Sequence, residues 1–202
     1  MALRWSIDTK NQGYNELEQA GFESVGIVRT VPAGRIITKG NQGHSTLTVN
    51  DTLFVNTGHA SLLDFKNGTM PESTFDLTPL YGENLKKATR RFVKDSPCLV
   101  YTIEDRLEVS PKTQSVTWQM LTQADVEIVE GGAILRQDGK VLKLQNISHP
   151  NLAISVISLY PAPMALNRQM ENLKRIEIRM PAWTIEDGHN EYTGASSAME
   201  IK

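Results

Sequence analysis

Hydrophobic and polar residues alternate with a period of two along much of the chain. The clearest runs are residues 116–121, 175–180 and 46–50. Successive side chains of a strand point to opposite faces of its sheet, so this pattern predicts strands with one buried and one solvated face. Trp118 occupies an apolar position of its run and is predicted to lie in the core rather than to serve as a platform for sugar rings.

Tight-turn sequences separate several of these runs. Asp138–Gly139 stands between two short apolar segments, and this dipeptide favours a type I′ hairpin turn, which needs positive φ at both central residues. Gly131–Gly132 predicts a second tight turn. Helical patterns are scarce, so we predict an all-β fold: an antiparallel, multi-stranded β-sandwich with very little helix, in which residues 1–202 form a single domain.

The charge balance gives no sign of a polyanionic partner. The 202 residues carry 21 Lys and Arg against 23 Asp and Glu, a formal net charge of −2. We therefore expect no nucleic-acid partner, and an acidic ligand would need a local basic patch. The densest basic cluster is Lys86, Lys87, Arg90 and Arg91. It is predicted to lie on a solvated edge strand, where lysines oppose aggregation, with contact to a polyanion as the alternative.

Two further features limit the function classes. Cys98 is the only cysteine, so no internal disulfide can form, and its apolar surroundings predict a buried structural thiol. No apolar run reaches the roughly 18 residues that a membrane-spanning helix needs, so we expect no membrane span.

No motif in the sequence is sufficient for catalysis by itself. A Gly-rich phosphate loop, an HExxH motif, a nucleophile elbow and a CxxC pair are all missing from the sequence, so no catalytic residue is assigned. His44 precedes a predicted strand and is interpreted as a loop histidine bonded to the backbone, with metal ligation or proton transfer as the alternative. Asp8 is interpreted as a solvated carboxylate or a turn cap.

Four segments carry a more specific pattern when they are taken in order. They are Arg4–Glu18 with its W-x-x-D…Q-x-Y…L-E residues, Gly43–Asn50, Phe75–Leu107 with its Asp-Leu-Thr-Pro, Ala-x-Arg and Glu-Asp elements, and Leu173–Trp183. The ordered set resembles the heparinase II/III family of bacterial polysaccharide lyases. The resemblance covers nearly the whole chain and identifies it as the C-terminal part of such a lyase.

The resemblance implies a supersandwich-like β-sandwich that follows an N-terminal helical toroid in the same polypeptide. Such enzymes cleave acidic, uronate-containing polysaccharides by β-elimination, in which a base removes the proton next to the uronate carboxylate. Many hold a structural zinc, and Asp8 and His44 match two of its three ligands by position. Tyr14 matches a position that lines the substrate cleft. A periplasmic or secreted location is implied by the resemblance alone.

The sequence departs from the family pattern in three places. It contains neither the histidine-bearing strand expected just before Trp5 nor the toroid, and Ser45 replaces the usual asparagine beside His44. Since metal affinity depends on a complete ligand set, we expect zinc to be weak or absent in this chain. We also expect the chain alone to support the cleft without cleaving glycan.

Two other functions remain open on the sequence. One is a non-catalytic carbohydrate-binding or accessory sandwich, which would need an exposed aromatic platform or a basic groove. The other is an adhesin-like surface interaction module.

Overall fold

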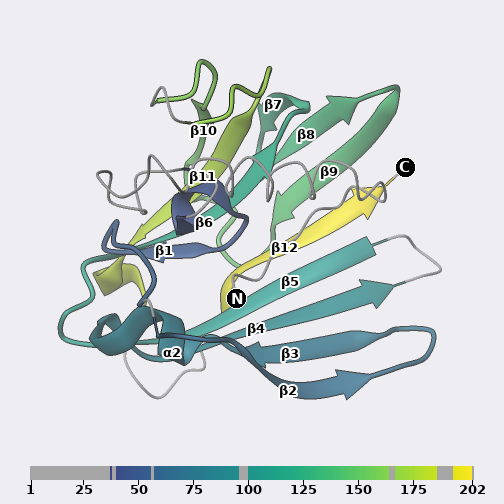
Figure 1. The fold of residues 1–202 in the computed structure, drawn as a ribbon. Helices are drawn as coiled ribbons and strands as arrows, with labels where there is room; N and C mark the ends of the chain where they lie inside the picture. The colour runs from purple at the N-terminus through teal and green to yellow at the C-terminus, as the bar shows by residue number, and fades with distance from the viewer. Residues whose placement is uncertain are drawn as a thin grey trace.

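The computed structural model describes residues 37, 40–55, 57–95, 100–163 and 167–185, together with the backbone of residues 193–201. These residues form two sheets in which every paired strand is antiparallel (Figure 1). The prediction of an all-β, antiparallel fold is thereby confirmed. Asp8, Tyr14 and Cys98 lie outside the described residues, so the expectations for them stay predictions.

The smaller sheet has the strand order β1-β6-β11-β10. Its strands are β1 (Leu47–Val49), β6 (Ser115–Thr122), β11 (Lys174–Pro181) and β10 (Ile154–Ser158). The larger sheet has the order β2-β3-β4-β5-β12-β9-β8-β7. Its strands are β2 (Ser61–Lys66), β3 (Glu72–Asp76), β4 (Leu85–Asp95), β5 (Val100–Val109), β12 (Thr193–Ile201), β9 (Lys140–Asn146), β8 (Gly132–Gln137) and β7 (Asp125–Val129).

Helix is confined, within the described residues, to one α-helical turn and three 3-10 turns. These are α2 (Thr78–Tyr81), η4 (Asn41–Gly43), η5 (Gly82–Asn84) and η6 (Ala182–Thr184). The α2 turn begins where Asp76 Oδ1 accepts a hydrogen bond from the Thr78 backbone N–H at 2.9 Å, and Pro79 fits its first turn because a proline needs no N–H there. No helix of the described part is long and apolar enough to cross a membrane.

Both predicted tight turns are present. Asp138 and Gly139 have φ of 50° and 72° and join β8 to β9, as a type I′ turn requires. Gly131, with φ of 66°, joins β7 to β8. The next residue must be small, because a Cβ on Gly132 would lie 2.2 Å from the Leu144 carbonyl oxygen on β9.

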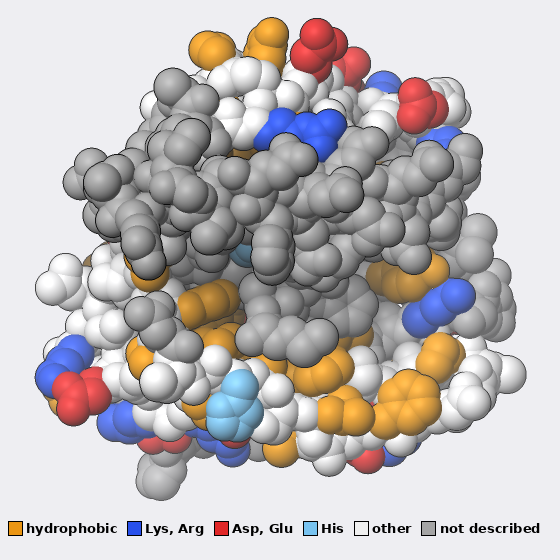
Figure 2. All heavy atoms as spheres, in the orientation of Figure 1, with side chains coloured by type: hydrophobic (Ala, Val, Ile, Leu, Met, Phe, Trp, Pro, Cys, Tyr) orange, Lys and Arg blue, Asp and Glu red, His pale blue; other side chains and the backbone are white. Residues whose placement is uncertain are grey.

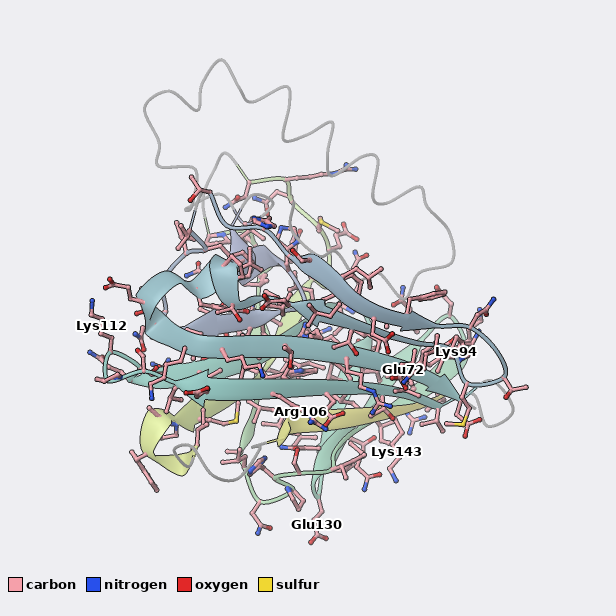
Figure 3. The ribbon with its side chains drawn as sticks, turned by 90° about the horizontal axis from the view of Figure 1, so that it is seen from below. Glu72, Lys94, Arg106, Lys112, Glu130 and Lys143 are labelled. Atoms are coloured by element: carbon pink, nitrogen blue, oxygen red, sulfur yellow. The ribbon has the colours of Figure 1, made fainter. Side chains whose placement is uncertain are left out.

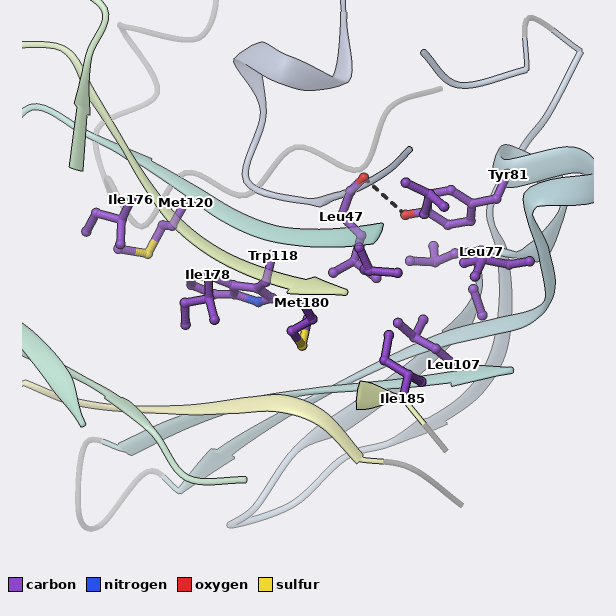
Figure 4. Close-up of a cluster of buried hydrophobic side chains, with 14 of the residues drawn as sticks. Leu47, Leu77, Tyr81, Leu107, Trp118, Met120, Ile176, Ile178, Met180 and Ile185 are labelled. Atoms are coloured by element: carbon purple, nitrogen blue, oxygen red, sulfur yellow. Dashed lines mark hydrogen bonds between the residues drawn. The ribbon is translucent and has the colours of Figure 1, made fainter. Parts of the chain in front are cut away.

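The hydrophobic core fills the space between the facing sides of the two sheets (Figure 4). The smaller sheet contributes Leu47, Val49, Val116, Trp118, Met120, Ile176, Ile178 and Met180, and the larger contributes Leu85, Ala88, Leu107, Val109, Ala133, Leu135 and Leu144. Trp118 is 2 % exposed, which confirms its prediction as a core residue. Truncating such a side chain to alanine costs roughly 3–5 kcal/mol, so this layer fixes how the sheets face each other.

One edge of the larger sheet carries exposed apolar side chains. β2 is the terminal strand of that sheet, and Leu62, Leu63 and Phe65 are each more than half exposed. Figure 2 shows hydrophobic side chains gathered over the β2–β5 part of the molecule. Contiguous apolar surface is uncommon on monomeric proteins in water, and edge strands are normally protected. This edge is therefore the most apolar part of the exposed surface of β2.

Candidate functional site at the junction of the two sheets

His44 lies between η4 and β1, on the segment that leads into the smaller sheet. Its backbone N–H donates to the Asn41 carbonyl at 3.1 Å, and the residue as a whole is half-buried. The prediction that it precedes a strand is confirmed, since β1 begins at Leu47. Within the described part of the chain, no group of three or more His, Cys, Asp or Glu side chains could hold a metal. The described residues alone therefore do not fit a zinc site.

Residues 40–46 cover the outer side of β6. Gln119 is 2 % exposed, and its Nε2 donates both to the Asn41 carbonyl at 2.6 Å and to the His44 carbonyl at 2.8 Å. Its Oε1 accepts from Thr48 Oγ1 at 3.1 Å. The prediction of a solvated face on this run is wrong, because Thr117 and Gln119 are 4 % and 2 % exposed, and residues 40–46 cover Gln119. Loop backbone can be buried only where its polar groups find partners, and a polar strand face supplies them.

Arg90 and Asp105 form a buried ion pair between the neighbouring strands β4 and β5. Arg90 Nε donates to Asp105 Oδ1 at 2.6 Å and Nη2 to Oδ2 at 2.8 Å, with the two side chains 3 % and 1 % exposed. Burial opposes the charge on Arg90, but the carboxylate of Asp105 outweighs it and holds the pKa of the guanidinium above its ordinary value. The bidentate geometry makes this a strong pair.

The same arginine reaches the segment that carries His44. Arg90 Nη1 donates to the Ser45 carbonyl at 3.2 Å, so a residue of the larger sheet holds the backbone that enters the smaller one. The Ser45 hydroxyl accepts from the Leu121 N–H of β6 at 3.1 Å. Ser45, where the family pattern has asparagine, thus ties this segment to β6 through its own side chain.

Tyr81 closes the junction from the α2 side. Its hydroxyl donates to the Leu47 carbonyl at 3.4 Å (Figure 4), and its ring packs edge-on against Phe54 with centroids 5.5 Å apart. Burial raises the pKa of the Tyr81 phenol well above its ordinary value, so the side chain is a neutral donor here. It serves the packing of α2 on β1.

The basic cluster at residues 86–91 is divided between environments. β4 lies between β3 and β5, so the prediction of an edge strand is wrong, and Arg90 is buried rather than solvated. A register shift between Leu85 and Lys87 separates Lys86 from the face of Arg90. Lys86 is exposed, with its Nζ 3.8 Å from Glu108 Oε1.

A ladder of alternating charges runs across β2, β3, β4 and β5 on the other side of the larger sheet. Its members, in order, are Lys66, Glu72, Arg91, Glu104 and Arg106, joined by contacts of 3.0, 2.5, 3.2 and 2.9 Å; Glu72 and Arg106 are labelled in Figure 3. Hydrogen bonds from Arg91 and then Lys66 hold the pKa of Glu72 at about 2, below its ordinary 4.5. Each cation of this ladder lies within 3.2 Å of a carboxylate.

Sequence reasoning selected His44 but missed the residues that hold its segment through the carbonyls of residues 44, 45 and 47, which are Gln119, Arg90 and Tyr81. Gln119 occupies a polar position of an alternating run, and only its burial in the structure shows that it has a structural role. Arg90 and Asp105 were visible as the Ala-x-Arg and Glu-Asp elements of one segment, but their cross-strand pairing needs the register Arg90↔Asp105. The two residues are 15 positions apart in the sequence, and the strand register places them opposite each other.

Replacing one partner of the buried pair should destabilise the protein strongly. Arg90→Met leaves the Asp105 carboxylate buried without its partner, and Asp105→Leu does the same to Arg90, so each should lower the free energy of unfolding by about 3–5 kcal/mol. The double variant should lose much less than the sum. Urea unfolding of the four proteins measures the coupling, with Lys86→Met, from an exposed pair, as a control expected to change by at most about 1 kcal/mol. Additive losses would refute a coupled pair.

Glu72 should make stability depend on pH in the acid range. Its pKa in the folded protein is about 2 against an ordinary 4.5, so its stabilisation is full above pH 4.5 and is lost as the pH falls toward 2. The melting temperature of Glu72→Gln should therefore be lower than that of the wild type at neutral pH, and the gap should close on acidification. Glu127→Gln, from an exposed pair at 3.7 Å, is the control; a gap for Glu72→Gln that does not change with pH would contradict the assignment.

No protein-family model matches the sequence, and no curated protein is significantly similar to it. Solved structures do share its fold. A heparinase III structure superposes with a TM-score of 0.56 at 13 % identity, covering 81 % of this chain and 24 % of that chain. Heparan sulfate lyase HepC from Pedobacter heparinus gives 0.57 at 15 % identity, covering 81 % and 25 %, and a HepC mutant gives 0.57 at 13 %, covering 96 % and 27 %.

The chain thus spans about a quarter of the length of the solved structures that it matches. At these identities the comparisons establish the fold. The resemblance of the sequence to the heparinase II/III lyases is confirmed at that level: the chain has the fold of a corresponding portion of heparinase III.

Proposed function

We propose that this chain is the C-terminal β-sandwich portion of a heparinase II/III-type lyase that cleaves acidic, uronate-containing polysaccharides by β-elimination. The observation that carries the proposal is the convergence of two family-like segments at one place. The His44 segment and the segment from Phe75 to Leu107 are far apart in the sequence, yet Arg90 joins them at 3.2 Å. The fold shared with heparinase III supports the same reading.

The part of this chain in the reaction is to build one wall of the cleft. β-Elimination needs a base for the proton next to the uronate carboxylate, neutralisation of that carboxylate, and an acid for the leaving oxygen. We assign none of these catalytic roles to a residue of this chain. They belong, in the proposal, to the junction with an N-terminal helical toroid of the same polypeptide, and the sandwich holds its side of that junction rigid.

Two residues outside the described part enter the proposal through the family pattern. Tyr14 is proposed to contact the polysaccharide, and Asp8 to stand with His44 as two ligands of a structural zinc in the whole enzyme. Oxygen and imidazole ligands suit zinc, but a two-ligand set should bind it weakly. The whole enzyme is proposed to be periplasmic or secreted, where polymeric glycans are met; the fate of an epitope-tagged whole protein on cell fractionation tests this.

The isolated 202-residue chain should fold and release no unsaturated uronate from heparan sulfate or alginate, because the proposed acid, base and carboxylate-binding groups are not its own. A protein extended by the helical toroid should release it. Ultraviolet absorbance of the new double bond follows both reactions, and metal analysis of the isolated chain should find zinc well below one equivalent. Product formation by the isolated chain would overturn the division of roles, and an inactive extended protein would overturn the lyase assignment.

A carbohydrate-binding module without lyase chemistry is the second candidate, and one observation favours it. Trp183, in η6, is 83 % exposed, and an exposed indole is a surface on which sugar rings can stack. Arg90 and Arg91 are not suited to this role, because both are held in ion pairs.

Binding of the isolated chain to immobilised glycans separates the two candidates. The accessory module predicts binding that Trp183→Ala removes, while Arg106→Ala, a change in the charge ladder of β5, leaves it intact. The lyase portion predicts no binding by the isolated chain in either case. Glycan binding that persists in Trp183→Ala would exclude this tryptophan as the platform.

A further inference from the structure

The backbone at residues 44–46 belongs to no helix or strand, yet hydrogen bonds fix it from several directions. The His44 carbonyl accepts from Gln119 Nε2 at 2.8 Å and the Ser45 carbonyl from Arg90 Nη1 at 3.2 Å. The Thr46 carbonyl accepts from the Gln119 N–H at 3.0 Å, and the His44 N–H donates to Asn41. Irregular backbone is ordinarily the mobile part of a fold, so this short stretch is held more firmly than its conformation requires.

The two side-chain donors come from different sheets and are themselves fixed. Gln119 projects from β6 of the smaller sheet. Its Oε1 accepts one hydrogen bond, from Thr48, and its Nε2 donates two, to the Asn41 and His44 carbonyls. Arg90 projects from β4 of the larger sheet and is oriented by its bidentate bond to Asp105. Both are at most 3 % exposed. The peptide planes on either side of Ser45 are therefore held by buried groups that cannot reorient without leaving partners unpaired.

We propose that Gln119 and Arg90 are positioning residues that set the direction in which the His44 side chain leaves the segment between η4 and β1. This inference rests on the proposed function of His44. Burying a loop needs only that its polar groups be paired, and water or short polar side chains can do this. Fixing two successive carbonyls from two sheets also fixes the peptide rotation on which the Cα–Cβ direction of His44 depends. Functional side chains must be held within about 0.5 Å of their working geometry.

Arg90 has a second consequence for the same segment. Because its Nε and Nη2 are committed to Asp105, a shift of β4 along β5 would move the Nη1 that holds Ser45. The position of the backbone beside His44 thus depends on the register between β4 and β5. Arg91, the next residue, bonds Glu72 and Glu104 instead and offers a matched control on the same strand.

Imidazole resonances in the isotope-labelled 22.5 kDa chain give a direct test, with His44→Gln used to assign the His44 signals. Gln119→Leu, which keeps the bulk but removes both donors, should shift and broaden the His44 signals and leave those of His59 in place. The double variant R90M/D105L removes the donor to Ser45 without leaving a buried charge alone, and should do the same. Arg91→Gln should leave His44 unchanged.

Unchanged His44 signals in folded Gln119→Leu and in folded R90M/D105L would overturn the proposal. Equal shifts of all histidine signals would also overturn it, since they would mean general loosening rather than positioning. In the toroid-containing protein, Gln119→Leu should lower kcat by up to about 100-fold, because a small displacement of one wall of the cleft misplaces the substrate. If that wild-type protein is inactive while the resonances behave as expected, the proposed function fails and the positioning of His44 stands.

Discussion

Removing a guanidinium and a carboxylate from water costs several kcal/mol for each ion, and the described fold accepts this cost at Arg90 and Asp105. The cost is offset only because the two side chains meet in a bidentate geometry on adjacent strands and the remaining arginine nitrogen finds the Ser45 carbonyl. An apolar pair could join β4 to β5 equally well, but it could not hold a backbone carbonyl of the segment that leads into the other sheet. The ion pair therefore links the two sheets as well as the two strands.

The burial of polar side chains on β6 follows from the same requirement. A loop that covers a sheet brings unpaired carbonyl and N–H groups with it, and these must be matched where water is excluded. Gln119 matches the Asn41 and His44 carbonyls at 2.6 and 2.8 Å, and the side chains of Asn41 and Thr48 continue the network to Gln119 with bonds of 3.0 and 3.1 Å. β6 is thus buried on both faces by different chemistry: Trp118 packs in the apolar core while Gln119 faces the loop. The polar cover gives residues 44–46 a defined path.

Periodicity along the chain predicts the strands and their apolar faces, but not what covers the polar faces. Alternation predicted the strands and the core position of Trp118, because the period of two arises within one strand and needs no knowledge of its neighbours. The exposure of Gln119 was predicted wrongly, since the segment that covers it pairs with it only in three dimensions. The prediction that the basic cluster lies on a solvated edge strand was wrong for a related reason. Arg90 and Arg91 are neighbours in sequence, but they point to opposite faces of a central strand: Arg90 forms a buried ion pair, and Arg91 belongs to the charge ladder.

The charges bear on where a polyanion could bind. Arg90 is matched by Asp105, Arg91 by Glu72 and Glu104, and Lys86 lies beside Glu108. A cation already paired with a carboxylate must break that pair or share it before it can neutralise a uronate, and either course weakens binding. Three of the four basic residues in this cluster thus lie beside a carboxylate, while Lys87 is exposed. If the proposed function holds, the positive charge that neutralises the substrate carboxylate comes from groups other than Arg90 and Arg91, and the sandwich contributes by holding its side of the cleft rigid.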